Sequence, residues 1–374
     1  MSRRCRLRIE NRRRLNSRIE TLEDRVVLSS APLLSTIVEE QVAPGVVMQR
    51  TQRDVSEVSV SQEGQPVRAG ATLAGNGLQF NLIPAVGMSA TAIAGFQAAA
   101  DLWSSIFTDD ILVNIEIDFT ALGAGILGQA SSTSESVSYA AFKTALNGDR
   151  TSISDNNSVS NLPAGPSLSL YTSDPAIGSP GNPIVDNNGS ANNVVLDVNT
   201  ANSKAAGTRA AGDATVDASI TFSSSFTWDF DRSDGISGGA FDFIGVAAHE
   251  IGHSLGFVSG ADIVDVTSGS GPFAPNSLDT FRVVTPLDLY RFSAGSITNG
   301  TDLDIRADTA AKSFSINGGA TTLTTFSTGS FNGDGRQASH WKDNLGIGIM
   351  DPTAAPGEYT DVTGLDVLAF DVIG

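Results

Sequence analysis

The most informative stretch of this chain reads FIGVAAHEIGHSLG, from Phe243 to Gly256. Its apolar residues recur at helical spacing, which predicts an amphipathic helix from about Phe243 to Leu255. Gly256 is placed to end that helix, because glycine adopts the left-handed conformation of helix C-termini at little cost. We therefore expect a helix that packs its apolar side and turns the other side toward a cleft.

Two of the three histidines in the 374 residues, His249 and His253, stand on this helix. Side chains four residues apart share a helix face, so both imidazoles can bind one Zn²⁺ at about 2.0–2.1 Å. Glu250, beside them, can then act on a metal-bound water. An H-E-x-x-H sequence can also occur incidentally on a buried helix, and that alternative stays open at this point.

A catalytic zinc site needs a third protein ligand and an open position. The downstream glutamate that many such sites use is absent, and Ser259 stands where the compact H-E-x-x-H-x-x-G-x-x-H pattern has its last histidine. Asp262 is near enough in sequence to compete, but His340 is the better donor because neutral imidazole suits zinc. The predicted ligands are therefore His249, His253 and His340, with Asp262 as the alternative third ligand.

The order of these motifs resembles the metzincin metallopeptidases, and most of all their leishmanolysin-like branch, in which an insertion separates the second and third zinc histidines. The matching segments are His249–Phe257, His340-Trp341 and Ile349-Met350-Asp351-Pro352. The segment H-E-I-G-H-S-L-G-F is also similar to that of a group of secreted bacterial metalloproteases. The resemblance implies a zincin/metzincin-like catalytic domain with a twisted mixed sheet, an active-site helix, a C-terminal helix and a turn at Met350 beneath the metal.

The same resemblance implies a zinc endopeptidase that acts on protein or peptide substrates. Glu250 would be the general base on the metal-activated water. Tyr359 is a candidate for contact with a tetrahedral intermediate, as a tyrosine makes in some metzincins, with a packing or surface role as the default. Two rival functions remain: a zincin-type hydrolase that uses Asp262, and a cell-surface adhesion module that keeps the fold without turnover.

Composition and charge limit the partners and the covalent links that this protein can have. The formal net charge is −18, although nine arginines lie within the first 25 residues, so the remainder is still more acidic. Such a surface repels nucleic acid and anionic membranes, and no stretch reads as a membrane span, so we expect neither as a partner. The single cysteine, Cys5, lies in the basic leader, which excludes disulfides from the processed protein.

The chain divides into three predicted parts. Residues 1–30 form a leader whose block Ile19–Leu28 resembles the LEPR-XLL leader of planctomycete surface and secreted proteins, with Asp24 where that motif has proline. This resemblance implies a secreted or cell-surface product, with a disordered basic tail as the alternative. Residues 31–75 are a linker or pro-segment. Residues 76–374 are the metallopeptidase domain, with an insertion at 258–339 between the second and third ligands.

Periodicity predicts an α+β fold with a loop- and β-rich C-terminal subdomain. The expected strands are Gln79–Ile83, Val113–Phe119, Val194–Val198 and Val216–Phe222, with short runs at Phe281–Val284, Leu289–Phe292, Ser313–Ile316 and Thr321–Phe326. The other expected helices begin after Ser89, near Tyr139, and after Thr360 or Thr363. Val216–Phe222 is expected at the sheet edge, where an extended peptide pairs, and 128–212 is expected to be mostly irregular.

One acidic loop is a candidate second metal site. Asp229, Asp231 and Asp234 offer three carboxylates before a glycine, which suggests a Ca²⁺ loop. The spacing departs from that of an EF-hand, and a solvated acidic turn is the alternative.

Overall fold

The structure is a computed structural model that describes residues 77–122, 126–173, 182–274, 278–279 and 281–374, together with the backbone of three short strands before them. These strands are β1 (Val26–Val27), β2 (Glu40–Ala43) and β3 (Val46–Met48). Most of the predicted leader and of the linker or pro-segment lies outside the described residues. β1 pairs antiparallel with β18 (Thr353–Ala354), and β2 pairs with β3.

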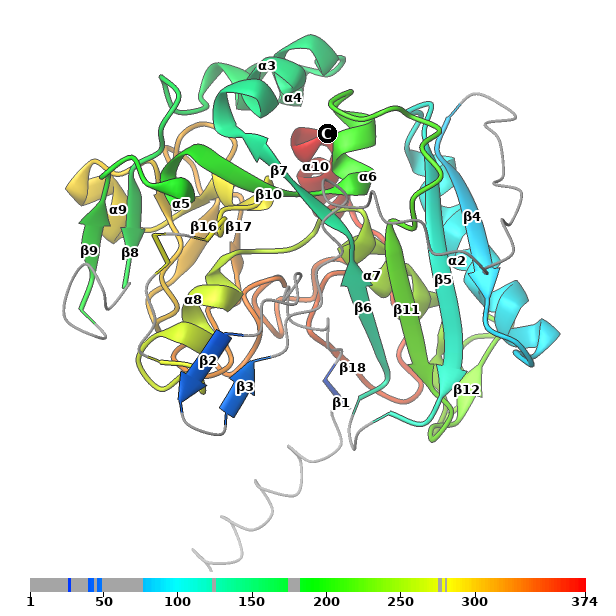
Figure 1. The fold of residues 1–374 in the computed structure, drawn as a ribbon. Coiled ribbons are helices and arrows are strands. Elements are labelled where there is room, and N and C mark those ends of the chain that lie inside the picture. The colour runs from blue at the N-terminus through cyan, green and yellow to red at the C-terminus, as the bar shows by residue number, and fades with distance from the viewer. Residues whose placement is uncertain are drawn as a thin grey trace, which may run out of the picture.

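A four-stranded mixed sheet in the order β4-β5-β11-β6 forms one half of the molecule (Figure 1). β4, β5 and β11 run parallel, and β6 runs antiparallel to β11. The strands are β4 (Gln79–Pro84), β5 (Leu112–Thr120), β6 (Gly128–Ser132) and β11 (Ala218–Ser223). The predictions of strands at Gln79–Ile83, Val113–Phe119 and Val216–Phe222 are confirmed.

The expected position of Val216–Phe222 at the sheet edge is wrong. β11 lies inside the sheet, with β5 on one side and β6 on the other. Alternation of apolar residues reports which face of a strand is buried and carries no count of its hydrogen-bonded neighbours. In the described part of the chain, β4 and β6 are the two edge strands of this sheet, and β6 is the one beside β11. Its sequence, Gly-Gln-Ala-Ser-Ser, has too little apolar content to have predicted a strand.

Two long helices, α2 (Ala90–Ile106) and α7 (Phe243–Ser254), lie side by side against one face of this sheet (Figure 1). Both match the predicted helices, and the Ser89 hydroxyl caps α2 by accepting the N–H of Ala92. Rings from α2, β11 and α7 form the core between them, with centroids 4.8–5.3 Å apart: Phe96, Phe222 and Phe243. Trp103 on α2 also donates its indole N–H to the Ala248 carbonyl on α7 at 2.9 Å, which fixes the two helices together.

The interval 128–212 is more ordered than its composition predicted. The helix α3 (Tyr139–Asp149) and the strand β10 (Val195–Asn199) are confirmed. The interval also contains β6, β7 (Ser134–Ser138), α4 (Ile153–Ser160), β8 (Leu170–Thr172), β9 (Ile184–Asp186), α5 (Ala191–Val194) and α6 (Thr200–Ala205). Polar contacts hold much of it, including a fully buried ion pair of 2.6 Å between Lys204 and Asp217. Periodicity does not register such contacts.

The second half of the molecule combines short elements of the predicted insertion with β8 and β9 of the interval 128–212 (Figure 1). Two three-stranded sheets, β14-β16-β17 and β15-β8-β9, lie here. The insertion's elements are α8 (Ala261–Thr267), a 3₁₀ turn η2 (Leu287–Tyr290), β14 (Arg291–Phe292), α9 (Ala294–Asn299), β15 (Leu303–Asp304), β16 (Lys312–Phe314) and β17 (Thr324–Phe326). Strands therefore overlap three of the four predicted runs. The run Phe281–Val284 forms no strand.

The chain closes with α10 (Gly364–Ile373), and Thr363 rather than Thr360 is its N-cap. A small parallel pair, β12 (Trp228–Asp229) and β13 (Phe241–Asp242), precedes α7. The fold is α+β, as predicted. No helix within the described ranges is long and apolar enough to cross a membrane.

Candidate metal centre

The two helical histidines are oriented by backbone carbonyls. The Nδ1 of His249 lies 2.7 Å from the Ile349 carbonyl oxygen, and the Nδ1 of His253 lies 2.7 Å from that of Phe257. A carbonyl oxygen can only accept, so both Nδ1 atoms carry the proton. A neutral imidazole then presents its Nε2 as a bare lone pair, which is the form that binds metal.

Gly256 makes one of these contacts possible. Its φ of +111° lets the chain turn sharply after α7 and bring the Phe257 carbonyl back to His253. A Cβ at this position would lie 2.0 Å from the side-chain oxygen of Asn202, whose amide donates to the Leu255 carbonyl at the end of α7. Glycine is therefore required here by conformation and by space.

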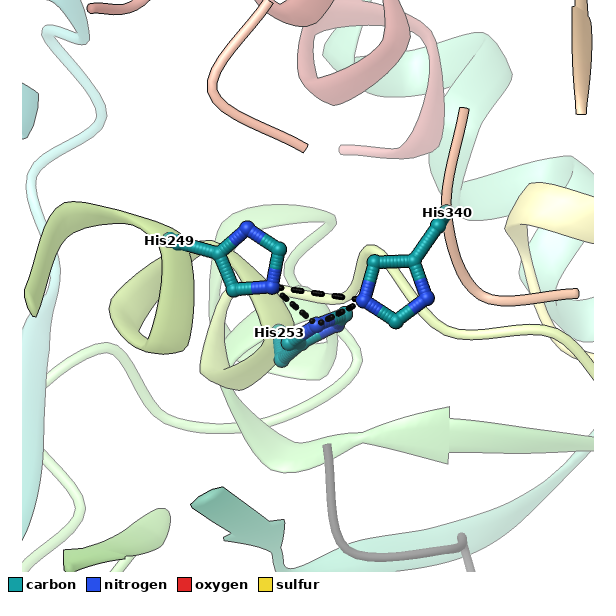
Figure 2. Close-up of side chains that lie close together, drawn as sticks. All are labelled: His249, His253 and His340. Atoms are coloured by element: carbon teal, nitrogen blue, oxygen red, sulfur yellow. Dashed lines mark hydrogen bonds between the residues drawn. The ribbon is translucent and has the colours of Figure 1, made fainter. Parts of the chain in front are cut away.

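His340 completes a triangle of nitrogen atoms (Figure 2). The Nε2 of His253 lies 3.0 Å from that of His249 and 3.2 Å from that of His340, and the third side measures 3.3 Å. All three imidazoles are at most 1 % exposed. Atoms so spaced can all lie about 2.0–2.1 Å from one common point, which is the distance of zinc–imidazole bonds.

The electrostatics of the triangle favour a cation at its centre. Burial lowers the pKa of His249 to about 4. Burial, and then the neighbouring imidazoles, lower the pKa values of His253 and His340 well below the usual range. The rings are therefore neutral at pH 7. Because the protons of His249 and His253 are on Nδ1, their Nε2 lone pairs meet with no proton between them. A positive ion removes that repulsion, and an all-imidazole donor set suits zinc, copper, iron or nickel.

Glu250 follows His249 on α7, and its side chain has no hydrogen-bond partner among the residues that the structure describes. Both of its carboxylate oxygens are buried and unpaired within the described part of the chain. Burial raises the pKa of Glu250 well above its usual value. A Cβ added to Gly128 would lie 3.2 Å from one of these oxygens, so the carboxylate is next to the edge strand β6. An unpaired buried carboxylate costs stability, and such a group marks a candidate functional site.

Met350 packs under the helical pair. It is fully buried, and a Cβ on Gly252, between the two histidines in sequence, would lie 2.6 Å from its sulfur. The preceding residue, Ile349, supplies the carbonyl that accepts from His249. Met350 therefore packs against the histidine helix at Gly252, and its place beneath a metal ion stays a prediction.

The insertion anchors His340, and Asp262 is one of the anchors. The Asp262 carboxylate on α8 accepts the backbone N–H of Ala338 at 2.6 Å and of Ser339 at 3.2 Å, and also the Ser339 hydroxyl. Arg291, fully buried on β14, donates to the Ala338 carbonyl. Among described residues, the group whose ligand atoms lie within 4.8 Å of one another consists of the three histidines, without Asp262. The structure thus places Asp262 behind His340 and not in the triangle.

The acidic loop does not form a comparable group within the described residues. Asp229 accepts the backbone N–H groups of Asp231 and Ser237, and Asp231 accepts that of Ser233. Hydrogen bonds from the side chains of Ser237 and Ser233, and then these backbone hydrogen bonds, lower the pKa values of Asp229 and Asp231, which keeps both carboxyls ionised in solvent-facing turns. Asp229, Asp231 and Asp234 are therefore not brought together as calcium ligands. They lie in a solvated acidic turn, which was the alternative to a calcium loop.

Tyr359 is held at the other end of α7. It is 53 % exposed, and its ring lies 4.4 Å from the guanidinium of Arg232. Arg232 in turn pairs with Asp242, the N-cap of α7. Seven residues of helix separate Asp242 from His249, or about 10 Å along the axis. Tyr359 therefore contacts a residue that pairs with the start of the helix, away from the histidines.

Sequence reasoning missed two residues that contact this centre. Gly128 gave no signal, because nothing in its surroundings marked a strand. Asp366 did give one: Thr363-x-x-Asp366 has the form of a capping box, which the structure contains. That pattern explains the start of α10 and says nothing of the further contacts of Asp366 described below.

The described residues thus bring together three nitrogen donors, and the helix that supplies two of them also carries a buried, unpaired carboxylate. Such a set can bind a metal ion and accept a proton beside it. No family model, curated protein or solved structure matches this chain.

Proposed function

We propose that this protein is a zinc-dependent peptidase in which His249, His253 and His340 bind the ion and Glu250 is the general base. One observation carries the proposal. Three Nε2 atoms lie 3.0–3.3 Å apart, and the helix turn between His249 and His253 carries the buried, unpaired carboxylate of Glu250. A zinc ion held by three imidazoles would polarise a substrate carbonyl and acidify a water in the open position.

Glu250 has the properties that proton transfer in hydrolysis requires. Its carboxylate has no competing donor in the described part of the chain, so it is free to accept a proton from an attacking water. Burial raises its pKa, so it can hold that proton before passing it to the leaving nitrogen. His249 and His253 keep their lone pairs available because the carbonyls of Ile349 and Phe257 hold their protons on Nδ1.

A peptide is the favoured substrate because of the edge strand. β6 is paired only with β11 among the described residues, and Gly128 on β6 lies next to Glu250. An extended peptide can add to such an edge through main-chain hydrogen bonds, which would bring its backbone to the carboxylate. β6 thus takes the role first expected of β11. A metzincin-like arrangement is further supported by the mixed sheet, by α7, and by Met350 packed under it.

The test compares wild type with Glu250→Gln and His340→Ala, and uses Asp231→Asn in the exposed loop as the control. We expect purified wild type to hold about one zinc per chain and to cleave members of a peptide library. Chelation should stop cleavage, and added zinc should restore it. Glu250→Gln should keep the metal and lose cleavage, His340→Ala should lose the metal, and Asp231→Asn should match wild type in zinc, calcium and activity.

Two results would count against the proposal. Wild type that binds no metal, or that cleaves equally well after chelation, would remove the role of the histidines. Metal-loaded wild type that cleaves no peptide would instead support a metal-binding surface module without turnover.

A further inference from the structure

The buried carboxylate of Asp366 on α10 joins the two segments that flank the histidine triangle. It accepts the indole N–H of Trp341 at 2.8 Å and the backbone N–H of Ile349 at 2.9 Å, with that of Met350 at 3.4 Å. It also accepts the N–H and hydroxyl of Thr363, its own N-cap. The side chain is fully buried, so these donors have no water to replace it.

The donors Trp341, Ile349 and Met350 lie next to the histidine site in the chain. Trp341 directly follows His340, and the carbonyl of Ile349 accepts the Nδ1 proton of His249. Trp341 and Met350 are also tied to one another by a backbone hydrogen bond of 3.0 Å. Asp366 therefore connects the segment carrying the third histidine to the turn that orients the first.

The backbone at Gly348 closely approaches the carboxylate of Asp366. A Cβ on Gly348 would lie 2.2 Å from one carboxylate oxygen of Asp366, and Gly348 has a φ of +69°. Glycine at this position lets the turn before Met350 approach α10 closely. The N–H and O–H donors around Asp366 bond to both of its carboxylate oxygens. A side chain at this position must therefore accept hydrogen bonds on two atoms.

We infer that Asp366 is a positioning residue for the metal centre, which fixes His340 and the carbonyl partner of His249 relative to each other. The inference rests on the proposed metal site. It extends that proposal by naming the residue that fixes the position of His340, the third ligand, relative to α7. Outer contacts of this kind typically change metal affinity by about 10- to 100-fold when removed.

Asp366→Asn is the decisive variant, because it keeps the size of the side chain but turns an NH₂ group toward N–H donors. Asp371→Asn on the same helix is the matched control, since Asp371 bonds to Ser152 and to none of the site segments described above. Zinc affinity by chelator competition, and the absorption spectrum of the cobalt-substituted protein, are the readouts. We expect Asp366→Asn to bind zinc at least about 10-fold more weakly, with an altered cobalt spectrum. Asp371→Asn should match wild type in both.

If Asp366→Asn is too unstable to measure, Trp341→Phe decides the question, because it removes one of the site donors and keeps a ring in the core. It should weaken zinc binding by a few-fold and alter the cobalt spectrum. Unchanged affinity and spectrum in whichever variant folds would overturn the positioning role, while leaving the metal site in place. Wild type that binds neither ion would instead overturn the proposed function, and the inference with it.

Discussion

Replacing Gly252 with alanine tests the packing of Met350 under the histidine helix. A Cβ at this position would lie 2.6 Å from the sulfur of Met350 and 3.3 Å from the ring of Phe370. Ordinary contacts between such atoms are about 3.5–4.0 Å, so the sulfur must retreat by about 1 Å. Met350 is fully buried and its backbone is held by hydrogen bonds, so its side chain has to shift within a packed environment.

The two opposing effects can be estimated. Alanine gains about 0.5–1 kcal/mol over glycine inside a helix. Overpacking a buried site costs about 1–3 kcal/mol. The difference of the two ranges is about 0–2.5 kcal/mol, so we expect Gly252→Ala to lower the free energy of unfolding of the metal-free protein by about 1 kcal/mol, and to weaken zinc binding as Met350 shifts.

Gly148→Ala is the matched control for this experiment. Gly148 lies in α3, and an added Cβ would meet nothing within 4 Å. Only the helix propensity should act there, so this variant should be stabilised by about 0.5 kcal/mol. Urea unfolding of both variants in chelator, followed by circular dichroism, measures the difference. If Gly252→Ala is stabilised to the same extent as Gly148→Ala, Met350 does not pack against this helix and the reasoning is refuted.

Three further predictions concern other parts of the molecule. Burial, and then neighbouring carboxylates, raise the pKa of Asp149 from 3.8 to about 6, so its stabilising contribution is present below pH 3.8 and is lost as pH rises through 6. Asp149→Asn should accordingly stabilise the protein at pH 7 by about 1 kcal/mol, after discounting for partial exposure, and not at pH 4; equal urea midpoints at pH 7 would contradict this. Gly128→Ala would place a Cβ 2.9 Å from Phe222 and 3.2 Å from Glu250, and should slow peptide cleavage with little change in bound zinc; wild-type turnover would show that the carboxylate does not work at this edge. Lys204→Met leaves the fully buried Asp217 without its cation and should cost about 3–5 kcal/mol in urea unfolding, whereas a cost below about 1 kcal/mol would mean that water enters this site.

Local patterns were sufficient for the elements that pack one apolar face against the core. β4, β5 and β11 alternate, α2 and α7 repeat at helical spacing, and Ser89 and Gly256 have clear reasons to begin and end their helices. Elements held mainly by polar contacts were not found, β6 above all. Its role at the sheet edge depends on which strand pairs with which, and this is a long-range property of the chain.

The candidate site divides along the same line. The sequence by itself determined that His249 and His253 share a helix face with Glu250 beside them, because helix geometry fixes neighbours four residues apart. It also singled out His340 by chemistry, since no other imidazole remained. Only the tertiary structure decided between His340 and Asp262, by bringing one to the triangle and using the other to anchor the segment behind it. The physical reason is that the segment between His253 and His340, which are 87 positions apart, folds into an anchoring subdomain. Its buried charges and hydrogen bonds join segments far apart in the chain, and no local pattern encodes such contacts.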